Sequence, residues 1–102
     1  MARSESAGTQ AVSDARPRVV MYTTAWCPYC IRARHLLKHK GVEFEDLRIE
    51  GRTDLRAEME ARSGRTSVPQ IFIGDLHVGG YDDMAALEHA GKLDALLAGE
   101  QL

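Results

Sequence analysis

The sequence predicts an α/β fold, built as a mixed four-stranded sheet with helices on both faces. Strand-like and helix-like segments alternate in the order β-α-β-α-β-β-α. The first two strands are separated by a helix, and this connection makes neighbouring strands parallel. The last two strands are separated only by Gly74 and Asp75, which predicts an antiparallel hairpin. A parallel unit joined to a hairpin gives a mixed sheet, which the helices then cover.

The first half of the chain predicts a strand, a helix and a second strand. The segment 18–24 is short and consists mostly of apolar and β-branched residues, as expected of a buried strand. A helix begins at Pro28, whose missing N–H suits the first helical turn. Gly41 is expected to end this helix in a left-handed conformation. Residues 42–49 predict the second strand, with a bulge or bend near Asp46 because the apolar residues change phase there.

The second half predicts a helix, the hairpin and a helical end. Thr53 or Asp54 is expected to cap a helix that runs through Ser63. The hairpin strands follow at 70–73 and 76–78. Beyond them the pattern becomes helical again and is broken once, before a short last helix. Met84 and Leu87 are the apolar positions before the break at Gly91, and Leu93, Leu96 and Leu97 are those of the last helix.

Length and composition predict one domain and exclude several classes of protein. We expect a flexible N-terminal tail over residues 1–17 and a single domain over 18–102. The formal charge is only -2, so no nucleic-acid partner is expected. No run of 18 apolar residues occurs, so no membrane partner is expected either. The tail lacks the apolar core of a secretory signal, which favours a cytoplasmic protein, and a monomer is the default expectation.

The two cysteines, Cys27 and Cys30, predict redox chemistry rather than a structural staple. A secreted fold of this size would carry four or more cysteines. Amides and the dipole at the start of a helix stabilise a thiolate, so Cys27 is the expected nucleophile and Cys30 the resolving thiol. Zinc is an alternative for this spacing, with His35 and His39 as further ligands. On a helix, however, those histidines lie on the far side from Cys30 and cannot converge with it.

Three motifs give the sequence a resemblance to the glutaredoxin family. Cys27-Pro28-Tyr29-Cys30 resembles its dithiol signature, residues 65–73 resemble its TVP segment, and 79–83 resemble its GG-x-[DS]-D segment. The likeness covers about residues 18–98 and is greatest to the bacterial class 3 dithiol glutaredoxins. It implies a thioredoxin-like fold with a cis Val68–Pro69 peptide.

The resemblance also implies a glutathione-binding groove beside the cysteines. The Val68 backbone would pair with the cysteinyl unit of glutathione, and the segment from Gly80 to Asp83 would hold the γ-glutamyl end. From the residues alone, an Asp at a helix start is more often a cap than a ligand. The implied groove residues are Tyr29, Arg65, Ser67, Val68, Pro69, Gly80, Tyr81, Asp82 and Asp83.

Two positions depart from the family pattern. Many glutaredoxins carry a lysine three residues before the first cysteine, where it meets the glycine carboxylate of glutathione. This sequence has Thr24 there, so the groove depends on Arg65 or on Thr24 as a neutral donor. A frequent additional cysteine is replaced by Tyr81. Trp26 is expected to flank the active site or to act as an apolar lid.

The resemblance implies a glutathione-dependent thiol–disulfide oxidoreductase that reduces protein disulfides and protein–glutathione mixed disulfides. Glutathione is the expected co-substrate, and no metal is expected. The expected partners are glutathione and disulfide-containing or glutathionylated proteins. Two alternatives stay open. One is a thioredoxin-like reductase supplied by a flavin reductase, and the other is a carrier of an iron–sulfur cluster.

Overall fold

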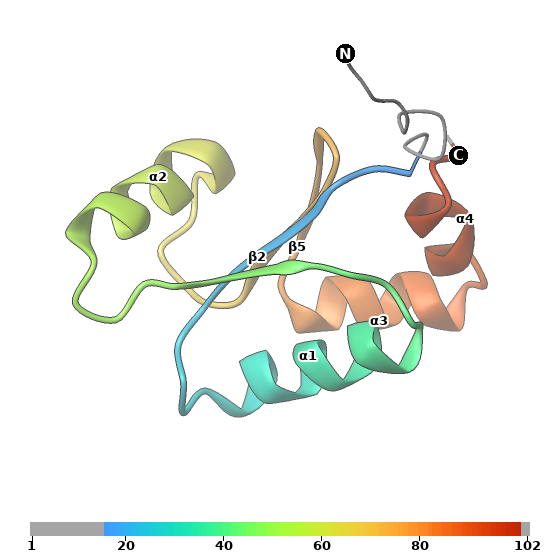
Figure 1. Cartoon of the computed structure of the whole chain (residues 1–102), viewed down its shortest axis with the longest axis horizontal. Helices are drawn as coiled ribbons and strands as arrows, with labels where there is room; N and C mark the ends of the chain where they lie inside the picture. The colour runs from blue at the N-terminus through green and yellow to red at the C-terminus, as the bar shows by residue number, and fades with distance from the viewer. Residues whose placement is uncertain (1–15, 101–102) are drawn as a thin grey trace, which may run out of the picture.

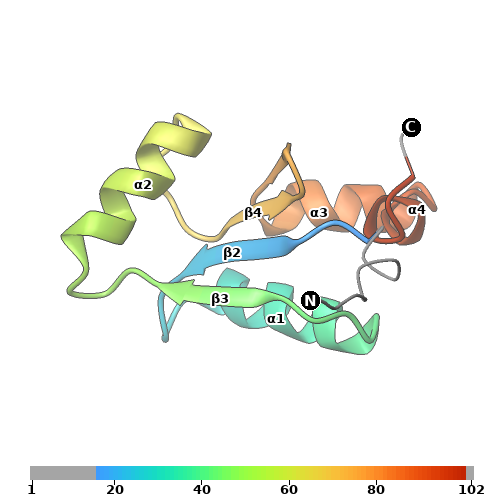
Figure 2. The same ribbon diagram turned by 45° about the horizontal axis from the view of Figure 1, so that its top comes forward.

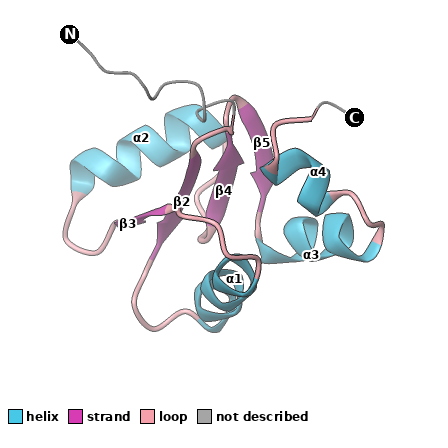
Figure 3. Ribbon diagram, turned by 45° about the vertical axis from the view of Figure 1, so that its right-hand side comes forward, coloured by secondary structure: helices cyan, strands magenta, loops and turns pink. Residues whose placement is uncertain are grey.

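The computed structural model describes residues 16–100 and confirms the predicted α/β architecture. One sheet has the strand order β3-β2-β4-β5, with β2 parallel to β3 and the other pairs antiparallel (Figures 2 and 3). Apart from Arg16 and Pro17, the predicted tail lies outside the described residues. The elements are β2 (Val19–Thr23), α1 (Pro28–His39), β3 (Glu45–Arg48), α2 (Thr53–Ser63), β4 (Gln70–Ile73), β5 (Leu76–Gly79), α3 (Tyr81–His89) and α4 (Leu93–Leu97).

Both faces of the sheet are covered, as predicted, and β2 supplies a core to each. Successive side chains of a strand point to opposite faces. Val19 and Met21 therefore pack with α1, α3 and α4, whereas Val20 and Tyr22 pack on the side of α2. Figures 1 and 3 show α2 on one side of the sheet and α1 with α3 on the other. All five residues of β2 are buried, so this strand is the centre of the fold.

The bulge predicted near Asp46 is wrong. β2 and β3 stay in register from Val20–Glu45 to Thr23–Arg48, without an interruption. The apolar residues change phase because the chain is covered on both faces: Phe44 packs in one core and Leu47 in the other. An irregular register occurs instead in the hairpin, between Ile71 and Phe72.

The helix ends fit the predictions in part. Gly41 has the expected left-handed conformation, with φ of 72°, just after the end of α1. The cap predicted for α2 is wrong, because Arg52 occupies the N-cap position and offers no side-chain cap. Asp54 lies in the first turn of α2 and pairs with the Arg52 guanidinium at 2.7 Å. Asp54 also lies at the positive end of the helix dipole, which stabilises its carboxylate.

The topology brings three chain segments together at one end of the sheet. Tyr22, near the end of β2, pairs with Gln70 at the start of β4, and Ile71 pairs with Gly79 at the end of β5. The start of α1, the loop before β4 and the start of α3 therefore meet there. None of the helices in residues 16–100 is long and apolar enough to cross a bilayer.

Candidate active site: a cysteine pair beside a shallow groove

Cys27 and Cys30 lie at the start of α1, and their surroundings differ. Cys27 is the N-cap residue, and its sulfur is half-buried. Cys30, one turn into the helix, is completely buried. Both are free thiols. The N–H groups of a first helical turn have no partner within the helix, and Cys27 lies beside them, where a substrate can reach its sulfur.

Burial raises the pKa of the Cys30 thiol to about 11, since a charged sulfur is poorly solvated inside the protein. A hydrogen bond from the Thr24 backbone opposes this rise, and the neighbouring Cys27 thiol adds to it. Cys30 is therefore a neutral thiol at physiological pH. The pair thus combines one accessible sulfur with one protected sulfur, as an attacking and a resolving thiol require.

The loop before β4 lies against Cys27. The Cys27 sulfur is 3.8 Å from the carbonyl oxygen of Val68. The Val68–Pro69 peptide is cis, as the family resemblance implied. Proline at the entrance of a strand donates no ladder hydrogen bond. An extended ligand can therefore run along this loop and place its own sulfur beside Cys27.

All nine residues predicted for the groove line one shallow hollow of about 170 Å³ next to this loop. They come from the start of α1, the loop before β4 and the start of α3. Two larger hollows lie elsewhere. One, of about 520 Å³, is lined in part by the loops that precede β2 and β3, and the other, of about 640 Å³, is lined in part by the hairpin turn between β4 and β5. The smaller hollow is lined by Val68, whose carbonyl oxygen lies 3.8 Å from the Cys27 sulfur, and neither larger hollow is, so the smaller one is the candidate binding groove.

The acidic end of the groove lies at the start of α3. Gly80 is the N-cap residue, and its N–H donates to the Asp83 carboxylate at 2.9 Å. The Arg65 guanidinium lies 3.4 Å from the same carboxylate, and both side chains are about half exposed. Asp83 therefore caps the helix, while Asp82 is exposed at the rim of the groove and makes no such contact.

Gly79 allows this arrangement, and replacing it tests the geometry. Its φ is +113°, and a Cβ atom there would overlap the Asp83 carboxylate. We expect Gly79→Ala to lower the free energy of unfolding by about 3 kcal/mol, from backbone strain together with the clash. Gly64→Ala is the matched control, since Gly64 also has positive φ but open space around it. It should cost only about 1 kcal/mol. Equal losses in urea unfolding would contradict a tight contact at Gly79.

The structure adds residues that the sequence patterns did not indicate. Gln70 is buried under the groove, where its amide donates to the Ser67 carbonyl oxygen at 3.1 Å. Arg34 and Glu50 reach the loop that leads to Cys27. Trp26 directly precedes Cys27 and is 88% exposed, so it lies at the surface beside the first cysteine.

His35 and His39, weighed as zinc ligands, are both exposed on α1. Cys30, in contrast, is buried on the inner face of that helix. Over residues 16–100, no three histidine, cysteine or acidic side chains gather around a common point.

Comparisons with known proteins match one family over most of the chain. The family model described as Glutaredoxin matches residues 19–78. A glutaredoxin of Pseudomonas aeruginosa is 62% identical over 82 residues, which are 80% of this chain and 98% of that protein. Glutaredoxin 3 of Escherichia coli is 56% identical over 79 residues, or 78% and 95% of the two chains. The solved buckwheat glutaredoxin–glutathione complex is 26% identical, with a TM-score of 0.74, covering 84% of this chain and 83% of that one.

A helix-start cysteine, a buried cysteine three residues later and a neighbouring cis-proline loop define a dithiol site on a thioredoxin-like fold. The chain belongs to the glutaredoxin family, and its relatives include the bacterial glutaredoxin 3. Membership implies thiol–disulfide oxidoreductase activity.

Proposed function

We propose that this protein is a glutathione-dependent oxidoreductase that reduces protein–glutathione mixed disulfides and protein disulfides. The observation that carries the proposal is the continuity of the site. Cys27 lies against Val68, and the hollow lined by Val68 continues from there to the start of α3. A tripeptide extended along this path would place its sulfur at Cys27 and its two charged ends away from it.

The chemistry follows from the two sulfurs. The Cys27 thiolate attacks the glutathione sulfur of a mixed disulfide, and the protein thiolate leaves and takes up a proton. Cys27 then carries the glutathionyl group. A second glutathione thiolate attacks that sulfur, which releases oxidised glutathione and restores Cys27. With a protein disulfide, the mixed disulfide forms between Cys27 and the protein, and Cys30 resolves it by forming the Cys27–Cys30 disulfide.

The groove offers complementary charges for the ends of glutathione. The free N–H groups at the start of α3 suit the γ-glutamyl carboxylate, and the exposed Asp82 carboxylate suits its ammonium group. Arg65 is half exposed, and although it lies 3.4 Å from Asp83, it is the cation that we assign to the glycine carboxylate, because Thr24 replaces the usual lysine. The hollow of about 170 Å³ suits the γ-glutamyl end, while the cysteinyl unit follows Val68. The buckwheat glutaredoxin was solved in complex with glutathione, which supports this choice of ligand.

The test compares two mixed disulfides of one peptide, one with glutathione and one with cysteamine. Cysteamine supplies the disulfide and a short ammonium arm but lacks the γ-glutamyl and glycine units with their carboxylates. With the Cys30→Ser variant, we expect release of the peptide thiol to be at least about tenfold more efficient from the glutathione disulfide, the worth of one or two charged hydrogen bonds.

Asp82→Asn should raise KM for the glutathione disulfide and leave the cysteamine disulfide unaffected. Asp75→Asn, at the exposed hairpin turn, is the matched control and should change neither. Equal efficiency with both substrates would remove glutathione recognition from the proposal while leaving thiol–disulfide exchange intact.

We also propose that the protein acts in the cytoplasm as a monomer. Two reduced cysteines without structural disulfides suit a reducing compartment. The partners would be glutathione and glutathionylated or disulfide-containing proteins.

A further inference from the structure

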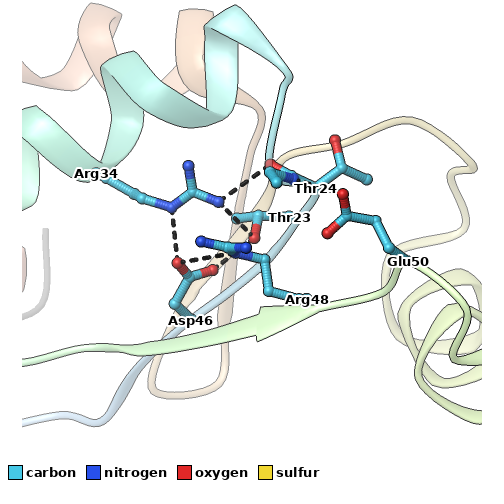
Figure 4. Close-up of polar contacts among 7 residues, drawn as sticks. Thr23, Thr24, Arg34, Asp46, Arg48 and Glu50 are labelled. Atoms are coloured by element: carbon cyan, nitrogen blue, oxygen red, sulfur yellow. Dashed lines mark hydrogen bonds and ion pairs between the residues drawn. The ribbon is translucent and has the colours of Figure 1, made fainter.

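The peptide group between Thr24 and Ala25 is held from both sides, and it belongs to the loop that leads to Cys27. Its carbonyl oxygen accepts from the Arg34 guanidinium at 3.1 Å, and its N–H donates to the Glu50 carboxylate at 3.0 Å. Arg34 comes from α1, and Glu50 follows β3. Figure 4 shows both side chains reaching the loop. Two charged side chains from different elements thus fix one peptide plane.

Arg34 is itself fixed by contacts to the sheet. Its Nε donates to Asp46 at 2.6 Å, and its terminal nitrogen also donates to the Thr23 hydroxyl at 3.0 Å. The Arg34 side chain is only 12% exposed, and that of Asp46 only 24%. A nearly buried ion pair adds little stability over apolar residues of the same size, because removing charges from water is costly. Stability alone therefore does not explain the ion pair of Arg34 with Asp46.

The network leads to Cys30. Arg34 lies four residues after Cys30 on α1, so the two side chains are neighbours on the same helix face. The Thr24 N–H, which belongs to the preceding peptide group, favours a charged Cys30 sulfur, and Arg34 holds the carbonyl of the same residue. The positive charge of Arg34 acts in the same direction and opposes the effect of burial on the Cys30 pKa.

We propose that Arg34, anchored by Asp46, is a positioning residue that prepares Cys30 to resolve the mixed disulfide at Cys27. In that step the Cys30 thiol loses its proton to solvent, and its thiolate attacks the Cys27 sulfur. The Cys27–Cys30 bond forms while the bond from Cys27 to the substrate sulfur breaks, and the leaving thiolate takes the electron pair. Arg34 stabilises the transient charge on Cys30 and holds the loop that hydrogen-bonds it. The inference rests on the exchange chemistry proposed above but not on glutathione.

The test isolates this step with a chromophore. The reduced protein is loaded at Cys27 with thionitrobenzoate from its aromatic disulfide, and release of the coloured thiolate by Cys30 is followed in a single turnover. We expect Arg34→Met to slow release about tenfold or more, as a small misplacement of reacting groups does. Arg34→Lys keeps a charge next to Asp46 and should recover most of the rate. Arg18→Met is the control, since it removes the exposed ion pair of Arg18 with Glu45 at the far end of the sheet.

A second comparison separates positioning from general damage. In the Cys30→Ser background, Arg34→Met should leave the reaction of Cys27 with the aromatic disulfide unchanged within about twofold, because no resolving thiol remains to be prepared. If Arg34→Met slows that reaction as much as it slows release, Arg34 supports the site as a whole and the inference is overturned. Unchanged release in Arg34→Met overturns it too. Failure of Cys27 to load at all would instead contradict the proposed function.

Discussion

Cys27→Ser abolishes turnover of every disulfide substrate, with an expected loss in kcat/KM of at least about a thousandfold. The reason is the position of the two sulfurs. Cys27 is the half-buried N-cap of α1, whereas Cys30 is completely buried and cannot meet a bulky substrate. A serine hydroxyl at position 27 remains protonated at neutral pH and cannot form a mixed disulfide. The protein then retains no accessible nucleophilic sulfur within the described residues.

Cys30→Ser is the matched variant, since it makes the same atomic change three residues away. It should keep the reduction of a glutathionylated peptide, because glutathione can resolve the intermediate, and lose the reduction of a protein disulfide. The measurement is a coupled assay in which a glutathione reductase consumes the oxidised glutathione. Substantial turnover by Cys27→Ser, with both variants folded by circular dichroism, would show that Cys27 is not the nucleophile.

The fold was predictable because its strongest signals are local. The apolar run of β2, the proline that begins α1 and the two-residue turn of the hairpin each act over a few residues. The strand β3 was harder to predict. Its apolar residues change phase because each face packs in a different core, and a pattern over eight residues does not distinguish this from a bulge.

The site, like the fold, was predictable in part: local motifs indicated some of its residues and not others. The cysteine pair and the groove segments form contiguous motifs, and the structure brings the groove residues together in one hollow. Gln70, Arg34 and Glu50 carry no comparable signal. From the sequence alone, a glutamine in an apolar strand is not expected to be buried, and an arginine on a helix is expected to be exposed to solvent. The contacts of Arg34 can be recognised only in the structure, where the parallel pairing of β2 and β3 places Asp46 beside α1.

The protected state of Cys30 leads to a second large expected effect, on its reaction with alkylating reagents. Burial raises the Cys30 pKa from 9.0 to about 11, so the folded protein holds this proton more tightly than the unfolded chain does. The thiol form therefore contributes its full stability below about pH 9, and this contribution is lost as the pH rises toward 11. Only the thiolate reacts with iodoacetamide.

In Cys27→Ser, where Cys30 is the remaining thiol, we expect alkylation at neutral pH to be at least about tenfold slower in the folded protein than in urea, because burial, the largest cause of the raised pKa, persists without Cys27. Complete burial of the sulfur adds to this protection. The rate in urea should level off near pH 9, while the folded protein should continue to gain about tenfold per pH unit beyond it. Circular dichroism at each pH shows that the chain is still folded. A folded-state rate that levels off near pH 9 would mean that the Cys30 sulfur is no less acidic than a free thiol, and burial would then not be what keeps the resolving thiol protonated until the mixed disulfide has formed.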